Sequence, residues 1–241
     1  TSAMAEESKK YDLSSLLAMR GEVARGDSIF HYLQGTKDEI EKIENVLKQN
    51  KWQVTPYMGK NGTEESFLNM HCKSPKLLHL ATHGFYYTPN RAENVDYLKG
   101  YTDAMSLSGL VFSGGNAAWL GKHLPKGVLG GILSANDIAR LDLSNTDMVV
   151  LSACQTGQGK ATAEGLYGLQ RAFKKAGVGT IVMSLWNVSD KTTSEFMTTF
   201  YERLAGKKNA WNKRKAFEEA KEIIRQKHPD PFHWAAFVML D

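Results

Sequence analysis

The chain has 241 residues, of which 42% are apolar and 23% charged, and its formal net charge is +4. This length allows one well-buried core, and the composition is that of an ordinary globular protein. No apolar run reaches the roughly 20 residues of a membrane helix, and no signal-peptide pattern is present, so we expect a cytoplasmic protein that does not bind membranes.

The chain has two cysteines, Cys72 and Cys154, which form neither a disulfide framework nor the spacing of a zinc finger. We therefore expect a protein of a reducing compartment without a bound metal. Basic residues gather between positions 207 and 227, but Glu218, Glu219 and Glu222 interrupt them. We interpret this stretch as a solvated helix face and not as a nucleic-acid surface.

The first half of the chain predicts alternating strands and helices. Residues 1–27 have weak periodicity and read as an N-terminal arm or the remnant of a preceding region, ahead of one domain over residues 28–241. Thr36 and Glu39 have the spacing of a capping box, and Thr63 resembles a second helix cap. The expected elements are a strand at 28–34, a helix at 36–50, a strand at 52–57, a helix at 63–70 and a buried strand at 77–81.

The second half continues the alternation. A hairpin is expected from strands at 108–113 and 130–133, with loops at 86–105 and 117–129 and a short helix at 134–141. Further strands are expected at 148–151, 179–185 and 234–240, and helices at 163–176, 190–204 and 210–226. The pattern predicts an α/β three-layer sandwich, in which a mostly parallel sheet with an inserted β-hairpin has helices on both faces.

Two chemically useful side chains follow buried strands at the point where each strand ends. His83 follows the strand at 77–81, and Cys154 follows the strand at 148–151. Ligands of open α/β sheets bind at this carboxyl edge, and a neighbouring imidazole can convert a thiol into a nucleophilic thiolate. The alternative is that Cys154 is a small buried residue and His83 a structural histidine. His79, inside its strand, is interpreted as a packed histidine, and Cys72 has no comparable setting.

Four motifs in order resemble one family: Thr82-His83-Gly84-Phe85, Leu151-Ser-Ala-Cys154-Gln-Thr-Gly157, Ser184-Leu-Trp186-Asn-Val-Ser-Asp190 and Trp234-Ala-Ala-Phe237. The chain resembles the CHAT domain, a caspase-like module found behind tetratricopeptide repeats in bacteria and grouped with caspases, separases, gingipains and clostripain. The resemblance implies that His83 is the base and Cys154 the nucleophile, with no cofactor. The N–H groups of Gly84 and Cys154 are expected to form an oxyanion hole.

Asp190 matches a separase position that lines the first specificity pocket, which implies cleavage after Arg or Lys. Its alternative role is that of a helix N-cap. Trp186 either walls the same pocket or packs against the final helix.

We therefore expect a cysteine endopeptidase that acts on a protein or peptide substrate. The resemblance further implies control by a tetratricopeptide-repeat sensor region, in the same chain or a complex, and a role in bacterial defence signalling. The alternatives are a catalytically silent scaffold that binds a partner in the same crevice, and a hydrolase of small esters or amides with the same dyad.

Overall fold

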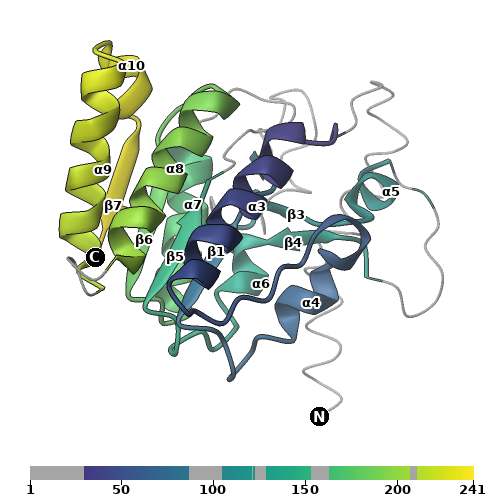
Figure 1. Cartoon of the computed structure of the whole chain (residues 1–241). Helices are drawn as coiled ribbons and strands as arrows, with labels where there is room; N and C mark the ends of the chain where they lie inside the picture. The colour runs from purple at the N-terminus through teal and green to yellow at the C-terminus, as the bar shows by residue number, and fades with distance from the viewer. Residues whose placement is uncertain (1–29, 87–104, 121, 123–128, 153–162, 207–210) are drawn as a thin grey trace.

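The computed structural model describes residues 30–86, 105–120, 122, 129–152, 163–206 and 211–241. Its centre is a four-stranded sheet in the order β1-β5-β6-β7, built from β1 (Leu77–Leu80), β5 (Met148–Leu151), β6 (Thr180–Ser184) and β7 (Phe237–Leu240). β1, β5 and β6 are parallel, and β7 runs antiparallel to β6 (Figure 1). The expected mostly parallel sheet is confirmed.

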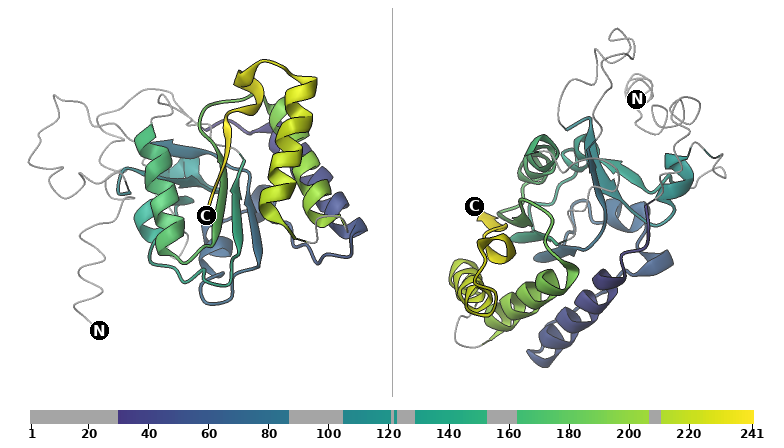
Figure 2. Two further views of the ribbon diagram at one scale, coloured as in Figure 1. Left: turned by 90° about the vertical axis from the view of Figure 1, so that its left-hand side faces the viewer. Right: turned by 90° about the horizontal axis from the view of Figure 1, so that it is seen from above.

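Helices cover both faces of this sheet (Figure 2). One face carries α3 (Gln34–Gln49), α8 (Asp190–Ala205) and α9 (Lys213–Lys227); the other carries α4 (Glu64–Leu68), α6 (Ala135–Ile138) and α7 (Ala163–Lys175). Short helices complete the description: η1 (Gly59–Asn61), α5 (Gly115–Trp119) and α10 (Pro231–Trp234). No helix in the described ranges has the length and apolar character needed to cross a membrane.

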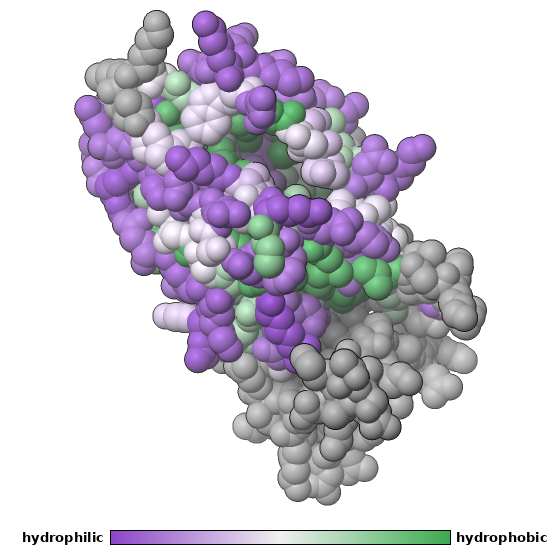
Figure 3. All heavy atoms as spheres, turned by 90° about the horizontal axis from the view of Figure 1, so that it is seen from below, coloured by the Kyte–Doolittle hydropathy of each residue, from purple (hydrophilic) through white to green (hydrophobic). Residues whose placement is uncertain are grey.

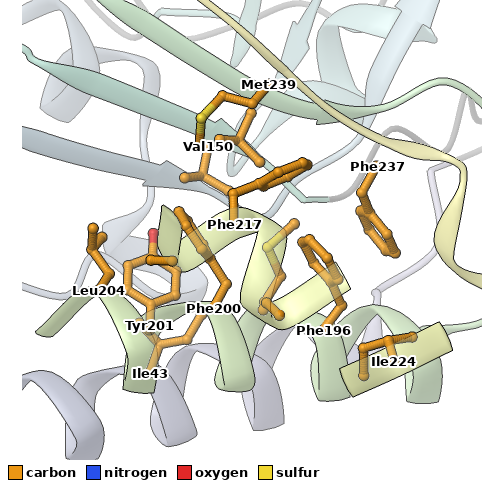
Figure 4. Close-up of a cluster of buried hydrophobic side chains, with 14 of the residues drawn as sticks. Ile43, Val150, Phe196, Phe200, Tyr201, Leu204, Phe217, Ile224, Phe237 and Met239 are labelled. Carbon is orange, nitrogen blue, oxygen red and sulfur yellow. The ribbon is translucent and has the colours of Figure 1, made fainter. Parts of the chain in front are cut away.

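The strand residues divide between two cores because strand side chains alternate in direction. Met148 and Val150 of β5 pack with α3, α8 and α9, whereas Val149 and Leu151 pack with the opposite helices. Figure 4 shows the first core, where stacked and edge-on aromatic rings dominate; Phe196 and Phe237 stack with their centroids 3.9 Å apart. Both faces of β5 are buried, which explains its continuous apolar sequence.

A second, antiparallel sheet has the order β2-β3-β4, from β2 (Gly84–Tyr86), β3 (Ser108–Val111) and β4 (Ile132–Ser134). β3 and β4 are the expected hairpin, and β2 adds a third strand that the sequence pattern did not predict. Gly109 is needed here, since a Cβ at this position would lie 2.2 Å from the carbonyl oxygen of Leu133.

The two expected strands nearest the N-terminus are wrong in the described structure. Residues 30–33 have no regular structure, and α3 begins at Gln34 with Leu33 at its N-cap. Thr36 therefore lies in the first turn, where its hydroxyl donates to the Leu33 carbonyl at 2.7 Å. Glu39 is buried in a contact with His79, so the capping box is also wrong.

Residues 52–57, the other expected strand, have no strand assignment in the structure. Their burial still alternates, because Trp52 and Val54 pack on the core while Gln53 and Thr55 are exposed. The sequence has the pattern of a strand, but a strand is defined by its ladder partner, and none of the described residues provides one.

Most other expected elements are confirmed, with bounds that shift by a few residues. Thr63 caps α4 by accepting the N–H of Ser66 at 3.1 Å, and Gly177 follows α7 with a φ of +95°. Two details differ. The helix α5 overlaps the start of the expected loop at 117–129, and Trp234, the first residue of the expected final strand, is instead the last residue of α10, which Asp230 caps.

Candidate active site

Two parallel neighbours, β1 and β5, end at the same edge of the sheet. Leu80 lies opposite Leu151 in the register, and the N–H of Ser152 donates to the Leu80 carbonyl at 3.2 Å. His83 follows the end of β1 by three positions, and Cys154 follows the end of β5 by three. The strands that precede His83 and Cys154 are therefore adjacent and parallel, and they end at one edge of the sheet. Cys154 itself, with residues 153–162, lies outside the described residues.

His83 is held between β3 and the start of the described chain. Its Nε2 atom lies 2.6 Å from the carbonyl oxygen of His31, and its ring centroid lies 5.4 Å from that of Phe30. Since a carbonyl only accepts, Nε2 carries the proton of this hydrogen bond, which leaves Nδ1 as the nitrogen that could act as a base. The preceding residue, Thr82, donates its hydroxyl to the carbonyl of Val111. These contacts orient an imidazole whose Nδ1 can accept a proton.

The N–H group of Gly84 takes no part in the ladder between β2 and β3. Val111 donates its N–H to the carbonyl of His83 at 2.9 Å, so His83 and Val111 form a hydrogen-bonded pair. The next pair, Gly84 and Leu110, is then a non-hydrogen-bonded pair of the antiparallel ladder. The N–H of Gly84 consequently points away from β3. The second expected donor, the N–H of Cys154, lies outside the described residues.

A pocket of about 30 Å³ opens at the carboxyl ends of β5 and β6. Asp190, at the start of α8, lines it together with Glu39, Ser152 and other residues: Leu33, Gly35, Thr36, Ser184, Asn187, Val188 and Thr193. Asp190 packs closely on Gly35, where an added Cβ would lie 2.8 Å from its Oδ2. The N-cap of α8 is Ser189, whose hydroxyl accepts the N–H of Thr192 at 3.2 Å. Asp190 is thus not the helix cap.

Trp186 does not line this pocket. Its indole Nε1 donates to the Phe232 carbonyl at 2.9 Å, and the two rings lie 6.2 Å apart. Phe232 belongs to α10, so this contact is with a short helix that the sequence pattern did not predict and not with the helix expected at 210–226.

A buried polar cluster under the pocket connects four elements. His79 Nε2 donates to Glu39 Oε1 at 2.9 Å and lies 3.2 Å from Ser152 Oγ, while His79 Nδ1 lies 2.9 Å from the Tyr201 hydroxyl. Burial, with a smaller contribution from the Glu39 charge, raises the pKa of Tyr201 far above its usual value, so its hydroxyl stays protonated. The packed role expected for His79 is confirmed. Glu39 and Ser152 were missed because Glu39 has the spacing of a capping residue and Ser152 matches no chemical pattern by itself.

Cys72 is exposed and precedes β1, at the opposite end of that strand from His83. Within the described ranges, no three His, Cys, Asp or Glu side chains are grouped so as to hold a metal ion.

The chain matches one family model over most of its length and two known proteins over less than half of it. The model of the CHAT domain family matches residues 3–241. Tetratricopeptide repeat protein 28 of Mus musculus and that of Homo sapiens are each 32% identical to the chain over 111 residues, which is 45% of this chain and 4% of each relative. The chain therefore spans a small part of these relatives. Because the family model covers nearly every residue, on a caspase-like α/β sandwich, the chain belongs to the CHAT domain family.

Proposed function

We propose that the protein is a cysteine-type endopeptidase with a His83–Cys154 dyad. The observation that carries the proposal is the parallel pairing of β1 with β5, since it brings His83 and the residue two positions before Cys154 to one edge of the sheet. The proton on His83 Nε2, directed at the His31 carbonyl, supports the same role because it leaves Nδ1 as the base.

In the proposed reaction, His83 Nδ1 takes the thiol proton of Cys154, and the thiolate sulfur bonds to the peptide carbonyl carbon. The N–H groups of Gly84 and Cys154 stabilise the negative oxygen of the tetrahedral intermediate. The C–N bond then breaks, and the leaving amine takes the proton from His83. Water, deprotonated by the same imidazole, hydrolyses the thioester and restores the thiol.

The pocket at Asp190 supports a preference for Arg or Lys before the scissile bond. Its lining contains the carboxylates of Asp190 and Glu39, and Glu39 is already paired with His79. Asp190 is therefore the carboxylate proposed to meet a substrate cation, by a charge-assisted hydrogen bond.

A tetratricopeptide-repeat region is the proposed regulatory partner, because the curated relatives that share this domain are named for such repeats. The second candidate function is a scaffold that binds a partner without turnover. The same relatives favour it, since their names describe repeats and no peptidase activity.

Thiol reactivity separates these functions, and Cys72 is a built-in reference. For an endopeptidase, iodoacetamide labels Cys154 at least tenfold faster than Cys72 at neutral pH, and His83→Ala removes the difference. Cleavage of a mixed peptide library is abolished by Cys154→Ala and retained by Cys72→Ala. Equal labelling rates together with no turnover contradict the peptidase and support the scaffold.

A further inference from the structure

One side chain holds the main chain of Phe30, just before α3. The N–H of Phe30 donates to Asn116 Oδ1 at 2.7 Å, and Asn116 Nδ2 donates to the Phe30 carbonyl at 2.9 Å. The two residues are 86 positions apart in the sequence. Both main-chain groups of Phe30 therefore point to one side, as they do for a paired residue of an antiparallel strand, and the amide of Asn116 takes the place of the partner strand.

The next carbonyl along the chain points to the other side, toward His83. Main-chain groups of successive residues alternate sides in an extended chain, so the His31 carbonyl faces away from Asn116. It accepts the Nε2–H of His83 at 2.6 Å. The contact that fixes which ring nitrogen of His83 carries the proton therefore lies one residue from the contact with Asn116.

The strand β3 supports both contacts. Val111, its last residue, donates its N–H to the His83 carbonyl at 2.9 Å. The chain then turns at Gly114, where φ is +92°, and enters α5, which carries Asn116 (Figure 1). A short and continuous piece of chain, residues 111–116, thus sets the position of the Asn116 amide relative to the main chain of His83.

The packing of the Phe30 ring agrees with this arrangement. The ring is buried among side chains of β2, β3, β4 and α5, with its centroid 4.9 Å from that of Trp119 and 5.4 Å from that of His83. Phe30 and His31 also border a groove of about 1180 Å³ within the described part of the chain. The space-filling view from below shows apolar side chains around a hollow in a largely hydrophilic surface (Figure 3). Because this space adjoins the segment, contacts from the side of α5 hold it in place.

We propose that Asn116 is a positioning residue of the active site. It fixes the His31 carbonyl, which in turn keeps the proton of His83 on Nε2 and leaves Nδ1 to accept the thiol proton. The proposal rests on the proposed role of His83 as the base. Without the carbonyl contact, the neutral ring also takes the form with its proton on Nδ1, and this form cannot accept a proton there. Asn116 acts through the main chain, so its loss should lower kcat and leave KM nearly unchanged.

Nitrogen NMR of the full chain with isotope-labelled histidines reads the position of this proton directly. The variant His83→Gln identifies the signals of His83 among those of the 7 histidines. We expect Nε2 to carry the proton in the wild type. In Asn116→Ala, the ratio of the Nε2–H form to the Nδ1–H form should fall roughly fivefold, the factor that corresponds to a hydrogen bond of about 1 kcal/mol.

Two further variants make the comparison specific. Asn116→Asp keeps the acceptor for the Phe30 N–H and loses the donor to the Phe30 carbonyl, so its ratio should lie between those of the wild type and Asn116→Ala. Asn136→Ala is the matched control, because Asn136 also makes a half-buried side-chain hydrogen bond, from Nδ2 to Ser106 Oγ at 2.7 Å. This control should leave the ratio unchanged. Thermal denaturation reports whether each variant folds.

Kinetic measurements on the same proteins separate this proposal from the proposed function. The kcat of peptide cleavage and the labelling rate of Cys154 should fall roughly fivefold in Asn116→Ala, with KM changed by less than about twofold. A lower ratio of ring forms in Asn116→Ala, with none of the proteins cleaving peptides, supports the positioning role and contradicts the peptidase.

An unchanged ratio in a folded Asn116→Ala overturns the positioning role, even where cleavage depends on Cys154. If Asn116→Ala does not fold, an unchanged ratio in Asn116→Asp overturns it in the same way. An equal fall in Asn136→Ala also overturns it, because the loss of an unrelated side-chain contact then shifts the ring. So does a proton on Nδ1 of His83 in the wild type, because the His31 carbonyl then does not set the form of the ring.

Discussion

Removing the Glu39 carboxylate should expose how much the polar cluster under the pocket contributes to stability. The side chains of Glu39 and His79 are 4% and 9% exposed, so Glu39→Ala removes the carboxylate acceptor of a buried imidazole N–H and leaves only the hydroxyl oxygen of Ser152 near it. A hydrogen bond to a charged group contributes about 1.5–3 kcal/mol, and the one lost CH₂ group adds about 0.8 kcal/mol. We expect a loss of about 2–4 kcal/mol, or roughly 4–16 °C in Tm for a domain of this size.

Urea and thermal denaturation of a matched set of variants measure this loss. Glu39→Gln keeps the shape and one acceptor oxygen, so it should lose about 1–2 kcal/mol. Glu41→Ala, whose side chain is 49% exposed in its pair with Lys37, should change stability by less than about 0.5 kcal/mol. A cycle with His79→Leu should give a coupling of about 1.5–3 kcal/mol. Additive losses, or an effect of Glu39→Ala as small as that of Glu41→Ala, would refute the reasoning.

Three further predictions concern other contacts. Burial raises the pKa of Glu64 to about 7 from 4.5, so its native carboxyl holds a proton that the unfolded one has lost between these values. Stability should therefore fall by about 1–2 kcal/mol as pH rises from 4.5 to 7, and Glu64→Gln should flatten this slope in denaturation series; an unchanged slope contradicts the assignment. Gly35→Ala would place a Cβ 2.7 Å from that of Asp190 and so displace this carboxylate. Any preference for Arg over Ala before the scissile bond should then fall at least tenfold, while the labelling of Cys154 is retained. An unchanged preference means that Asp190 does not select the cation. Ser189→Ala removes the cap of α8 and should lower stability by about 1 kcal/mol in urea, whereas Ser189→Asp should restore it; equal stability of all three proteins rules out the cap.

Local sequence chemistry was sufficient wherever a few neighbouring residues decide the structure. The apolar run at β5, the cap at Thr63 and the left-handed position at Gly177 depend on side-chain burial, one hydroxyl and the lack of a Cβ. The position of His83 after a strand belongs to this class too, because the run at 77–80 and the small residues after it are visible in the sequence. The expected burial of that strand holds only for Leu78, since its other residues are partly exposed. The orientation of the Gly84 N–H group could not be predicted in this way, because it follows from the pairing of β2 with β3.

Contacts between segments that are distant in the sequence determine the features that local patterns did not predict. Thr36 and Glu39 have the spacing of a capping box. The Glu39 side chain instead points into the core, where it bonds to His79, 40 positions away in the sequence, so it does not cap the helix. Residues 52–57 have the sequence pattern of a strand. The main-chain hydrogen bonds of a strand depend on a neighbouring strand, which cannot be identified from the sequence of the segment itself. The sequence by itself determined which segments are apolar, where strands end and which motifs identify the CHAT family. Only the tertiary structure decided which strand ends share an edge, that Ser189 and not Asp190 caps α8, and which carboxylates line one pocket. Those outcomes depend on distances between residues far apart in the chain, which no local pattern encodes.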